Sequence, residues 1–268
     1  MLLALSRHWP EYLMEAAELG AFMIAACVAA VVLFDEVSPV ALLLPSPILR
    51  RLFMGCAMGG TAVAIVYSPW GKQSGAHFNP AVTLTFLLLG KIAPWDAAFY
   101  VLSQFAGGLA GVLLSAAILG NSLAAPGVDY IVTEPGPEGT LVAFVGEFTI
   151  SLLLMTAVLF ISNRPPLAAY TGWVVGMLLV IYVSVEAPLS GMSMNPARTF
   201  GSALPAGVWN AWWVYFTAPP LAMLAAAALY VRVHGMHGVL CAKLHHANAK
   251  RCIFLCGYEG DRTKASAS

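Results

Sequence analysis

Long apolar runs separated by short polar connections dominate the chain. Six stretches reach the length of about 20 mostly apolar residues that a helix needs to cross hydrocarbon. They lie at approximately 11–34, 49–68, 96–119, 139–161, 167–187 and 210–231. Runs such as 152–155 and 225–228 are apolar at every position, whereas membrane β-strands alternate between apolar and polar residues. The pattern therefore predicts an all-α integral membrane protein with six transmembrane helices.

Composition supports this prediction and separates a tail from the membrane region. Of 268 residues, 60% are hydrophobic and only 10% are charged, against about 25% charged residues in an ordinary soluble domain. The 13 basic and 13 acidic residues balance, so no net field favours nucleic acid as a partner. Charged residues are concentrated after position 231. We predict a membrane domain over 1–232 and a polar tail over 233–268.

The charges of the connections predict an orientation. An even number of spans places both termini on one side of the membrane. The basic residues in connections on that side are Lys72, Lys91 and Arg164. Connection 120–138 lies on the other side and contains acidic residues but no Lys or Arg. Arg50 and Arg51 oppose this assignment but are outnumbered, so the positive-inside rule predicts cytoplasmic termini. We expect the membrane to be the plasma membrane.

An internal repeat makes the architecture more specific. The segment 74–83, Ser-Gly-Ala-His-Phe-Asn-Pro-Ala-Val-Thr, matches Ser-Gly-Met-Ser-Met-Asn-Pro-Ala-Arg-Thr at 190–199 in six of ten positions. Each half of the chain, about 11–120 and 139–232, has three predicted spans and one Asn-Pro-Ala motif between the second and third. Because three is odd, the second half enters from the opposite face, which makes the repeat inverted.

The Asn-Pro-Ala motifs predict two helix starts inside the membrane. Asn is a strong N-cap residue, and Pro suits the first helical position, where its missing N–H is not needed. The apolar stretches that follow, 81–89 and 197–204, rise only about 15 Å, or half the hydrocarbon thickness. We expect two re-entrant half-helices whose N-termini meet at the midplane. The motif residues are Asn79, Pro80, Ala81, Asn195, Pro196 and Ala197.

The segments before each motif predict a pore lining. Non-helical backbone persists at membrane depth only when it is buried in protein or lines a water-filled cavity. We expect a ladder of carbonyl acceptors there, suited to a small neutral hydrogen-bonding molecule, while the positive helix ends oppose cations and protons. The ladder residues are Gly75, Ala76, His77, Gly191, Met192 and Ser193.

From about Glu15 to Tyr230 the chain resembles the aquaporin, or major intrinsic protein, family. The resemblance rests on segments 74–83 and 194–201, on an acidic residue in each half and on a glutamine in the third span. These last three residues are Glu18, Glu147 and Gln104. The resemblance implies a passive channel that forms a homotetramer with one pore per subunit.

The resemblance also implies a selectivity filter around Arg198. Gap-free spacing from the two asparagines gives Gly59, Val183 and Met192 as its other members. Water-selective relatives usually have an aromatic residue and His at the first two positions, so this atypical filter implies a wider or less polar constriction.

Residues flanking the filter resemble those of the water-channel branch. These are Thr199, Ala203 and Tyr215-Phe216. We therefore expect water conduction, possible passage of small neutral solutes, and exclusion of ions. The alternative is a facilitator mainly of such solutes, for example glycerol, ammonia or a metalloid acid.

Two carboxylates within spans have two interpretations. Glu18 in Ala17-Glu18-Leu19 and Glu147 in Gly146-Glu147-Phe148 occupy related places in the two halves. An intramembrane carboxylate can relay protons, which would indicate an ion-coupled secondary transporter. Alternatively, each accepts N–H bonds from an irregular loop. The repeat and the resemblance favour this bracing role.

The tail contains a candidate metal site of Cys241, His245, Cys252 and Cys256. On a helix, Cys241 and His245 are spaced i,i+4, as are Cys252 and Cys256, so each of these two pairs supplies two ligands for a tetrahedral zinc. The alternative is a basic amphipathic tail on the inner membrane surface. Elsewhere the sequence contains no nucleophile–base set or phosphate loop, so it predicts neither an enzyme nor a bound cofactor.

Overall fold

The computed structural model describes residues 1–258, and within them six helices are long and apolar enough to cross a membrane. These are α1 (Leu2–Phe34), α3 (Pro47–Tyr67), α6 (Pro94–Leu119) with the turn that continues it to Ala124, α7 (Thr140–Ser162), α8 (Thr171–Val185) with the turn that precedes it from Ala168, and α11 (Trp213–His234). All six predicted spans are therefore confirmed. The first helix begins well before the predicted boundary at residue 11.

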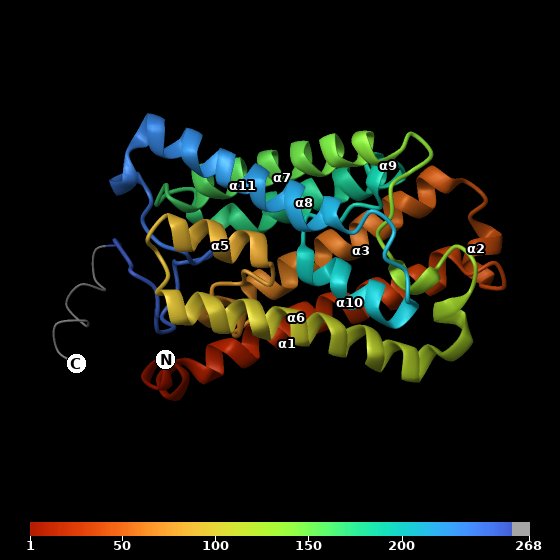
Figure 1. The fold of residues 1–268 in the computed structure, drawn as a ribbon, viewed down its shortest axis with the longest axis horizontal. Helices are drawn as coiled ribbons and strands as arrows, with labels where there is room; N and C mark the ends of the chain where they lie inside the picture. Colours follow the sequence, from red (N-terminus) through yellow and green to blue (C-terminus); the bar gives the residue numbers. More distant parts are fainter. Residues whose placement is uncertain (259–268) are drawn as a thin grey trace.

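Two short helices complete the membrane fold. Figure 1 shows α5 (Pro80–Leu88) and α10 (Pro196–Ala206) enclosed among the long helices. Each begins with Pro at its first position, after an asparagine with extended backbone. The predicted all-α architecture of six spans with two half-helices is confirmed.

Shorter helical turns form the connections. They are α2 (Pro39–Leu43), α4 (Gly71–Ser74), η1 (Gly120–Ala124), η2 (Asp129–Ile131), η3 (Ala168–Tyr170), α9 (Ala187–Ser190) and η4 (Met236–Gly238). α4 and α9 are repeat-related, since each ends in a left-handed glycine before a re-entrant loop.

The long helices bury small and polar residues and expose large apolar ones. Leu114, Leu153 and Val185 are 51%, 50% and 70% exposed, while Gln104 and Glu147 are buried. This distribution suits a protein whose outer surface faces lipid, where apolar side chains are well solvated.

Glycines allow the helices to approach closely. α1 crosses α6 at Gly20, Gly107 and Gly111, and a Cβ at Gly107 would overlap with the backbone of Ala16. In the other half of the bundle, a Cβ at Gly59 would lie 2.8 Å from a methyl carbon of Val180. Small residues at such crossings are typical of membrane helix pairs, which associate through close packing.

The N-terminus and the last described residues, up to 258, lie at one end of the bundle, called here the terminal face (Figure 1). There, after α11 and η4, residues 239–258 form a non-helical C-terminal segment. The Leu244 N–H donates to the Gly75 carbonyl (3.1 Å), and the Leu255 N–H donates to the Lys91 carbonyl (3.0 Å). The helical register assumed for the candidate tail metal site is therefore wrong.

This segment folds without a helix because its groups find partners elsewhere in the chain. The Lys243 ammonium is buried and donates to the carbonyls of Lys250 and Arg251. Arg251 in turn forms an ion pair with Glu11 of α1. Residues 259–268 of the predicted tail lie outside the described residues, and the 1–232 and 233–268 division stays a prediction.

We predict that Gly107→Ala destabilises the protein by about 1–3 kcal/mol, the usual cost of forcing a methyl group into a packed contact. The added Cβ would push α6 away from α1. Thermal unfolding in detergent measures the effect. The matched control is Gly60→Ala, where a Cβ meets no atom within 4 Å. Equal transition temperatures for the two variants would contradict this account of the α1–α6 contact.

Candidate functional site

The two asparagines cap the half-helices and link them to each other. The Asn79 Oδ1 accepts the Ala81 N–H (2.9 Å), and the Asn195 Oδ1 accepts the Ala197 N–H (3.0 Å). Their amide groups cross over: the Asn79 Nδ2 donates to the Met194 carbonyl, and the Asn195 Nδ2 donates to the Phe78 carbonyl, both at 2.8 Å. The helix N-termini thus meet from opposite sides, joined by a reciprocal pair of hydrogen bonds.

The loop before each asparagine has a left-handed backbone at three of its four positions. Both loops begin with glycine, Gly75 at φ +101° and Gly191 at φ +76°. The other residues with positive φ in these two loops are Ala76, Phe78, Met192 and Met194. Such conformations are unfavourable for residues with a Cβ and persist only where surrounding contacts enforce them. The repeated pattern therefore requires strong partners for the backbone of both loops.

Glu147 supplies those partners in the second half. Its carboxylate accepts the N–H groups of Ser193 (2.5 Å) and Met194 (2.7 Å) and the Ser190 hydroxyl (3.0 Å). Because Glu147 is buried on α7, it satisfies two loop donors that water does not reach.

In the first half the same contacts are divided between two glutamates. Glu15, which the sequence analysis left out of the bracing pair, accepts the N–H groups of His77 (2.9 Å) and Phe78 (2.7 Å). Glu18, which was predicted as the brace, accepts only the Ser74 hydroxyl (2.7 Å). The assignment of the loop N–H groups to Glu18 is therefore corrected to Glu15, one turn earlier on α1.

Other side chains repeat between the halves and hold the loops from outside. The Tyr100 hydroxyl donates to the Ser74 carbonyl (2.6 Å), as the Tyr215 hydroxyl does to the Ser190 carbonyl (2.7 Å). The first half has a further hydrogen bond, in which the Gln104 side-chain amide donates to the Glu15 carboxylate (2.7 Å). Each loop is thus held at its start and its middle.

A cavity of about 250 Å³ lies on the side of the asparagines away from the terminal face. Its wall includes three of the four residues predicted for the filter: Val183, Met192 and Arg198. Gly59 is not among the residues lining this cavity. It faces α8, and its neighbour Met58 occupies the cavity wall instead. The gap-free spacing from the asparagine is therefore off by one residue. It selects Gly59, on the face of α3 that packs against α8, instead of Met58.

A smaller cavity of about 60 Å³ continues toward the terminal face. Its wall contains both asparagines, the loop residues Ala76 to Phe78, and Leu244 of the C-terminal segment. The two cavities share Phe22, Leu179, Ser193 and Arg198 as lining residues. They therefore form successive parts of one path along the bundle.

Arg198 is held in position at the junction of these cavities. Its backbone N–H donates to the Asn195 Oδ1 (3.2 Å), and its guanidinium donates to the Ile131 carbonyl (3.0 Å). The segment that supplies Ile131 also bonds to α10 through Thr133, whose hydroxyl lies 2.8 Å from that of Thr199. Connection 120–138 thus fixes the charged group against the path.

The predicted carbonyl ladder is only partly arranged as expected. Ala76 and His77 line the smaller cavity, while Gly191 and Met192 line the larger one and Ser193 lines both. The Gly75 carbonyl instead accepts the N–H of Leu244. It is therefore occupied by the C-terminal segment.

The tail residues also assemble differently from the prediction. Cys241, Cys252 and Cys256 come together with His246, and the four ligand atoms lie within 4.8 Å of one another. His245 points elsewhere, with its ring edge-on to Tyr67 at 5.1 Å. Burial lowers the pKa of His245, and the nearby Lys72 charge lowers it further. The membership of His245 in the cluster is therefore corrected to His246.

The sequence-based predictions thus missed three functional candidates: Glu15, Met58 and His246. A signal existed for Glu15, because it is a second acidic residue within the first apolar run. Met58 and His246 each lie one position from a predicted residue. Which of two adjacent residues faces the site depends on the rotation of the helix in the case of Met58 and on the path of the loop in the case of His246.

Comparison with known proteins identifies the family. Aquaporin NIP6-1 of Arabidopsis thaliana is 38% identical over 183 residues, covering 67% of this chain and 58% of that protein. Aquaporin NIP1-2 of Oryza sativa subsp. japonica is 31% identical over 177 residues, covering 65% of this chain and 58% of that protein. The matched region thus spans less than two thirds of these plant relatives.

The fold is shared with a solved structure, the aquaglyceroporin from Plasmodium falciparum. The TM-score is 0.68 at 18% identity, with coverage of 84% of this chain and 96% of that chain. Residues 6–230 match the family described as "Major intrinsic protein". With its inverted repeat, paired half-helices and cross-bonded asparagines, the chain belongs to the major intrinsic protein family of membrane channels.

Proposed function

We propose that this protein is a passive channel that conducts water in single file past Asn79 and Asn195. The carrying observation is the reciprocal asparagine pair, which sets two helix N-termini on the wall of a continuous path. Amide groups and loop carbonyls there offer hydrogen bonds that replace those of bulk water. The positive ends of α5 and α10, together with Arg198, oppose cations and protons.

The carboxylates support a channel over an ion-coupled transporter. Glu15, Glu18 and Glu147 accept hydrogen bonds from the loops. Among described residues, the ionisable groups on the walls of the two cavities are Arg51, His77 and Arg198. Glu15, Glu18 and Glu147 do not line either cavity, which leaves them poorly placed to carry a coupling ion, so we assign these groups a bracing role.

Small neutral solutes are the second candidate class, in addition to water. The observation that favours them is the apolar wall of the larger cavity, where Met58, Val183 and Met192 face Arg198. Apolar side chains accommodate the carbon skeleton of a solute such as glycerol, while the guanidinium donates to its hydroxyls. The likeness to an aquaglyceroporin supports this candidate at the level of fold.

We further propose that the terminal face is cytoplasmic and the membrane is the plasma membrane. Lys72, Lys91 and Arg164 support the orientation, because their loops lie at the face where the C-terminal segment docks. The family resemblance supports a homotetramer with one pore per subunit. In this proposal the chain has no catalytic role.

Stopped-flow light scattering on proteoliposomes tests the channel. We predict faster shrinkage in sucrose than for empty liposomes, and little of this water flux in Val183→Trp, whose indole would fill the wall of the larger cavity. Val185→Trp, on the same helix but 70% exposed, is the matched control and should conduct like the parent. Shrinkage of parent liposomes no faster than that of empty ones would refute water conduction.

Reswelling after transfer to glycerol distinguishes the two candidate substrates. Because the larger cavity has an apolar wall, we predict measurable glycerol entry that is also lost in Val183→Trp and kept in Val185→Trp. The absence of glycerol entry in liposomes that conduct water would restrict the channel to water.

We predict that Glu15→Gln and Glu147→Gln impair water flux and thermal stability more than Glu18→Gln does. A glutamine at 15 or 147 retains one acceptor oxygen for two loop N–H groups, and each buried donor left unpaired costs about 1–3 kcal/mol. At position 18 one oxygen still accepts the Ser74 hydroxyl. Thermal unfolding and stopped-flow rates measure both effects. A larger loss in Glu18→Gln than in Glu15→Gln would return the bracing role to Glu18.

A further inference from the structure

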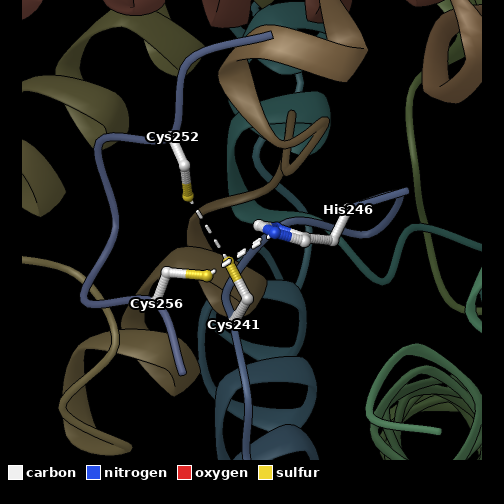
Figure 2. Close-up of side chains that lie close together, drawn as sticks. All are labelled: Cys241, His246, Cys252 and Cys256. Atoms are coloured by element: carbon white, nitrogen blue, oxygen red, sulfur yellow. Dashed lines mark hydrogen bonds between the residues drawn. The ribbon is translucent and has the colours of Figure 1, made fainter. Parts of the chain in front are cut away.

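The C-terminal segment brings three thiols and one imidazole together at the terminal face. Figure 2 shows the side chains of Cys241, His246, Cys252 and Cys256 converging from separate parts of this segment. The four residues follow the spacing Cys-x4-His-x5-Cys-x3-Cys within 16 positions of the chain. None of them lines the cavities of the proposed pore. The proposed conduction path therefore does not explain why these four side chains lie together.

Two of the distances between ligand atoms match the edges of a tetrahedral metal site. The Cys241 and Cys252 sulfurs are 3.6 Å apart, as are the Cys256 sulfur and the His246 Nε2. In tetrahedral zinc, bonds of about 2.3 Å to sulfur and about 2.0 Å to nitrogen separate neighbouring ligand atoms by about 3.5–3.8 Å. The same sulfur separation is too long for a disulfide, whose bond is about 2.05 Å.

Backbone groups support sulfur in its ligand form. A backbone N–H two residues further along hydrogen-bonds toward each sulfur. The pairs are Lys243 with Cys241, Phe254 with Cys252 and Tyr258 with Cys256. Such supporting bonds orient the ligands of protein metal sites.

The charge of the surroundings suits a zinc centre with three thiolates. Three thiolates and a neutral imidazole around Zn²⁺ carry a net charge of −1, which needs a positive partner when it is not exposed to water. The buried Lys243 ammonium supplies a positive charge nearby, since it donates to the carbonyls of Lys250 and Arg251, next to Cys252. The His246 ring stacks on Tyr258 at 4.3 Å, which fixes its orientation.

We propose that Cys241, His246, Cys252 and Cys256 bind one structural Zn²⁺, which fastens the C-terminal segment beneath the first re-entrant loop. The fastened segment reaches the loop directly. The His77 Nε2 lies 2.9 Å from the Ala242 carbonyl, and the Phe254 ring stacks on His77 at 5.4 Å. Metal binding would thus hold Leu244 in the wall of the smaller cavity. The metal site itself does not depend on the proposed channel function.

Metal content of the full-length chain, purified in detergent under reducing conditions without chelator, tests the proposal. We expect about one zinc per chain, falling by roughly ten-fold or more in His246→Ala and Cys252→Ser, because a structural site needs all four ligands. His245→Ala and Cys56→Ser are matched controls and should keep the parent's zinc. A parent without zinc, or equal zinc in His246→Ala and the parent, would overturn the site.

Cobalt provides a second measurement that does not depend on the variants folding. Zinc is removed from the parent by chelation and Co²⁺ alone is added. We expect the visible absorption of tetrahedral cobalt thiolate, reversed by added Zn²⁺. Absence of this absorption, or a Cys241–Cys252 disulfide in protein kept under reducing conditions, would contradict the proposal.

Limited trypsin digestion tests whether the metal fastens the segment. The bond after Lys250 lies between the ligands, and the carbonyls of Lys250 and Arg251 are held by Lys243. Removing zinc should speed cleavage there by about ten-fold, and restoring Zn²⁺ should slow it again, because metal binding stabilises the folded segment. Cleavage at the same rate with and without zinc would show that the metal does not fasten the segment.

Discussion

The structure depends on satisfying the backbone of two irregular loops that meet inside the membrane. In hydrocarbon, an unpaired N–H or carbonyl costs several kcal/mol, and water is not available to replace the missing partner. Glu15 and Glu147 meet this requirement from the long helices, and the two asparagines meet it across the midplane. Because each asparagine bonds the other loop, neither half-helix has its native surroundings without the other half of the chain.

The repeat explains this shared centre, but segments outside the repeat cover its two ends. On the terminal face, the C-terminal segment bonds Gly75 and His77. On the opposite side, connection 120–138 bonds Arg198 and Thr199. The Gly75 position shows why glycine is needed, since it has φ +101° and a Cβ would lie 2.7 Å from the Phe254 ring. The centre of the path is thus symmetric, whereas its two ends are built from unrelated pieces of chain.

The sequence predicted the spans and half-helices because their signals are local. Span length follows from apolar runs, and an Asn-Pro pair specifies a helix start by its own backbone chemistry. Two of the errors came where a neighbour one turn or one residue away has the same chemical character. Glu15 and Glu18 both lie on α1, and only the orientation of the helix decides which carboxylate reaches the loop N–H groups. His245 and His246 differ only in the direction of a loop, which long-range contacts such as Tyr67 with His245 determine.

In the larger cavity, the residues that carry charge differ from the residues that set the width of the path. A guanidinium in hydrocarbon costs at least about 2.5 kcal/mol, so Arg198 is stable only because the Ile131 carbonyl and the path itself solvate it. Around it, Met58, Val183 and Met192 present no hydrogen-bonding group of comparable strength. In the proposed channel, a permeating molecule would therefore meet two guanidinium groups in this cavity, those of Arg51 and Arg198. Such a wall rejects cations by electrostatics while setting only a loose limit on the shape of neutral molecules, since Met side chains are flexible. In the proposed channel, exclusion of charge and selection by size are therefore assigned to different residues.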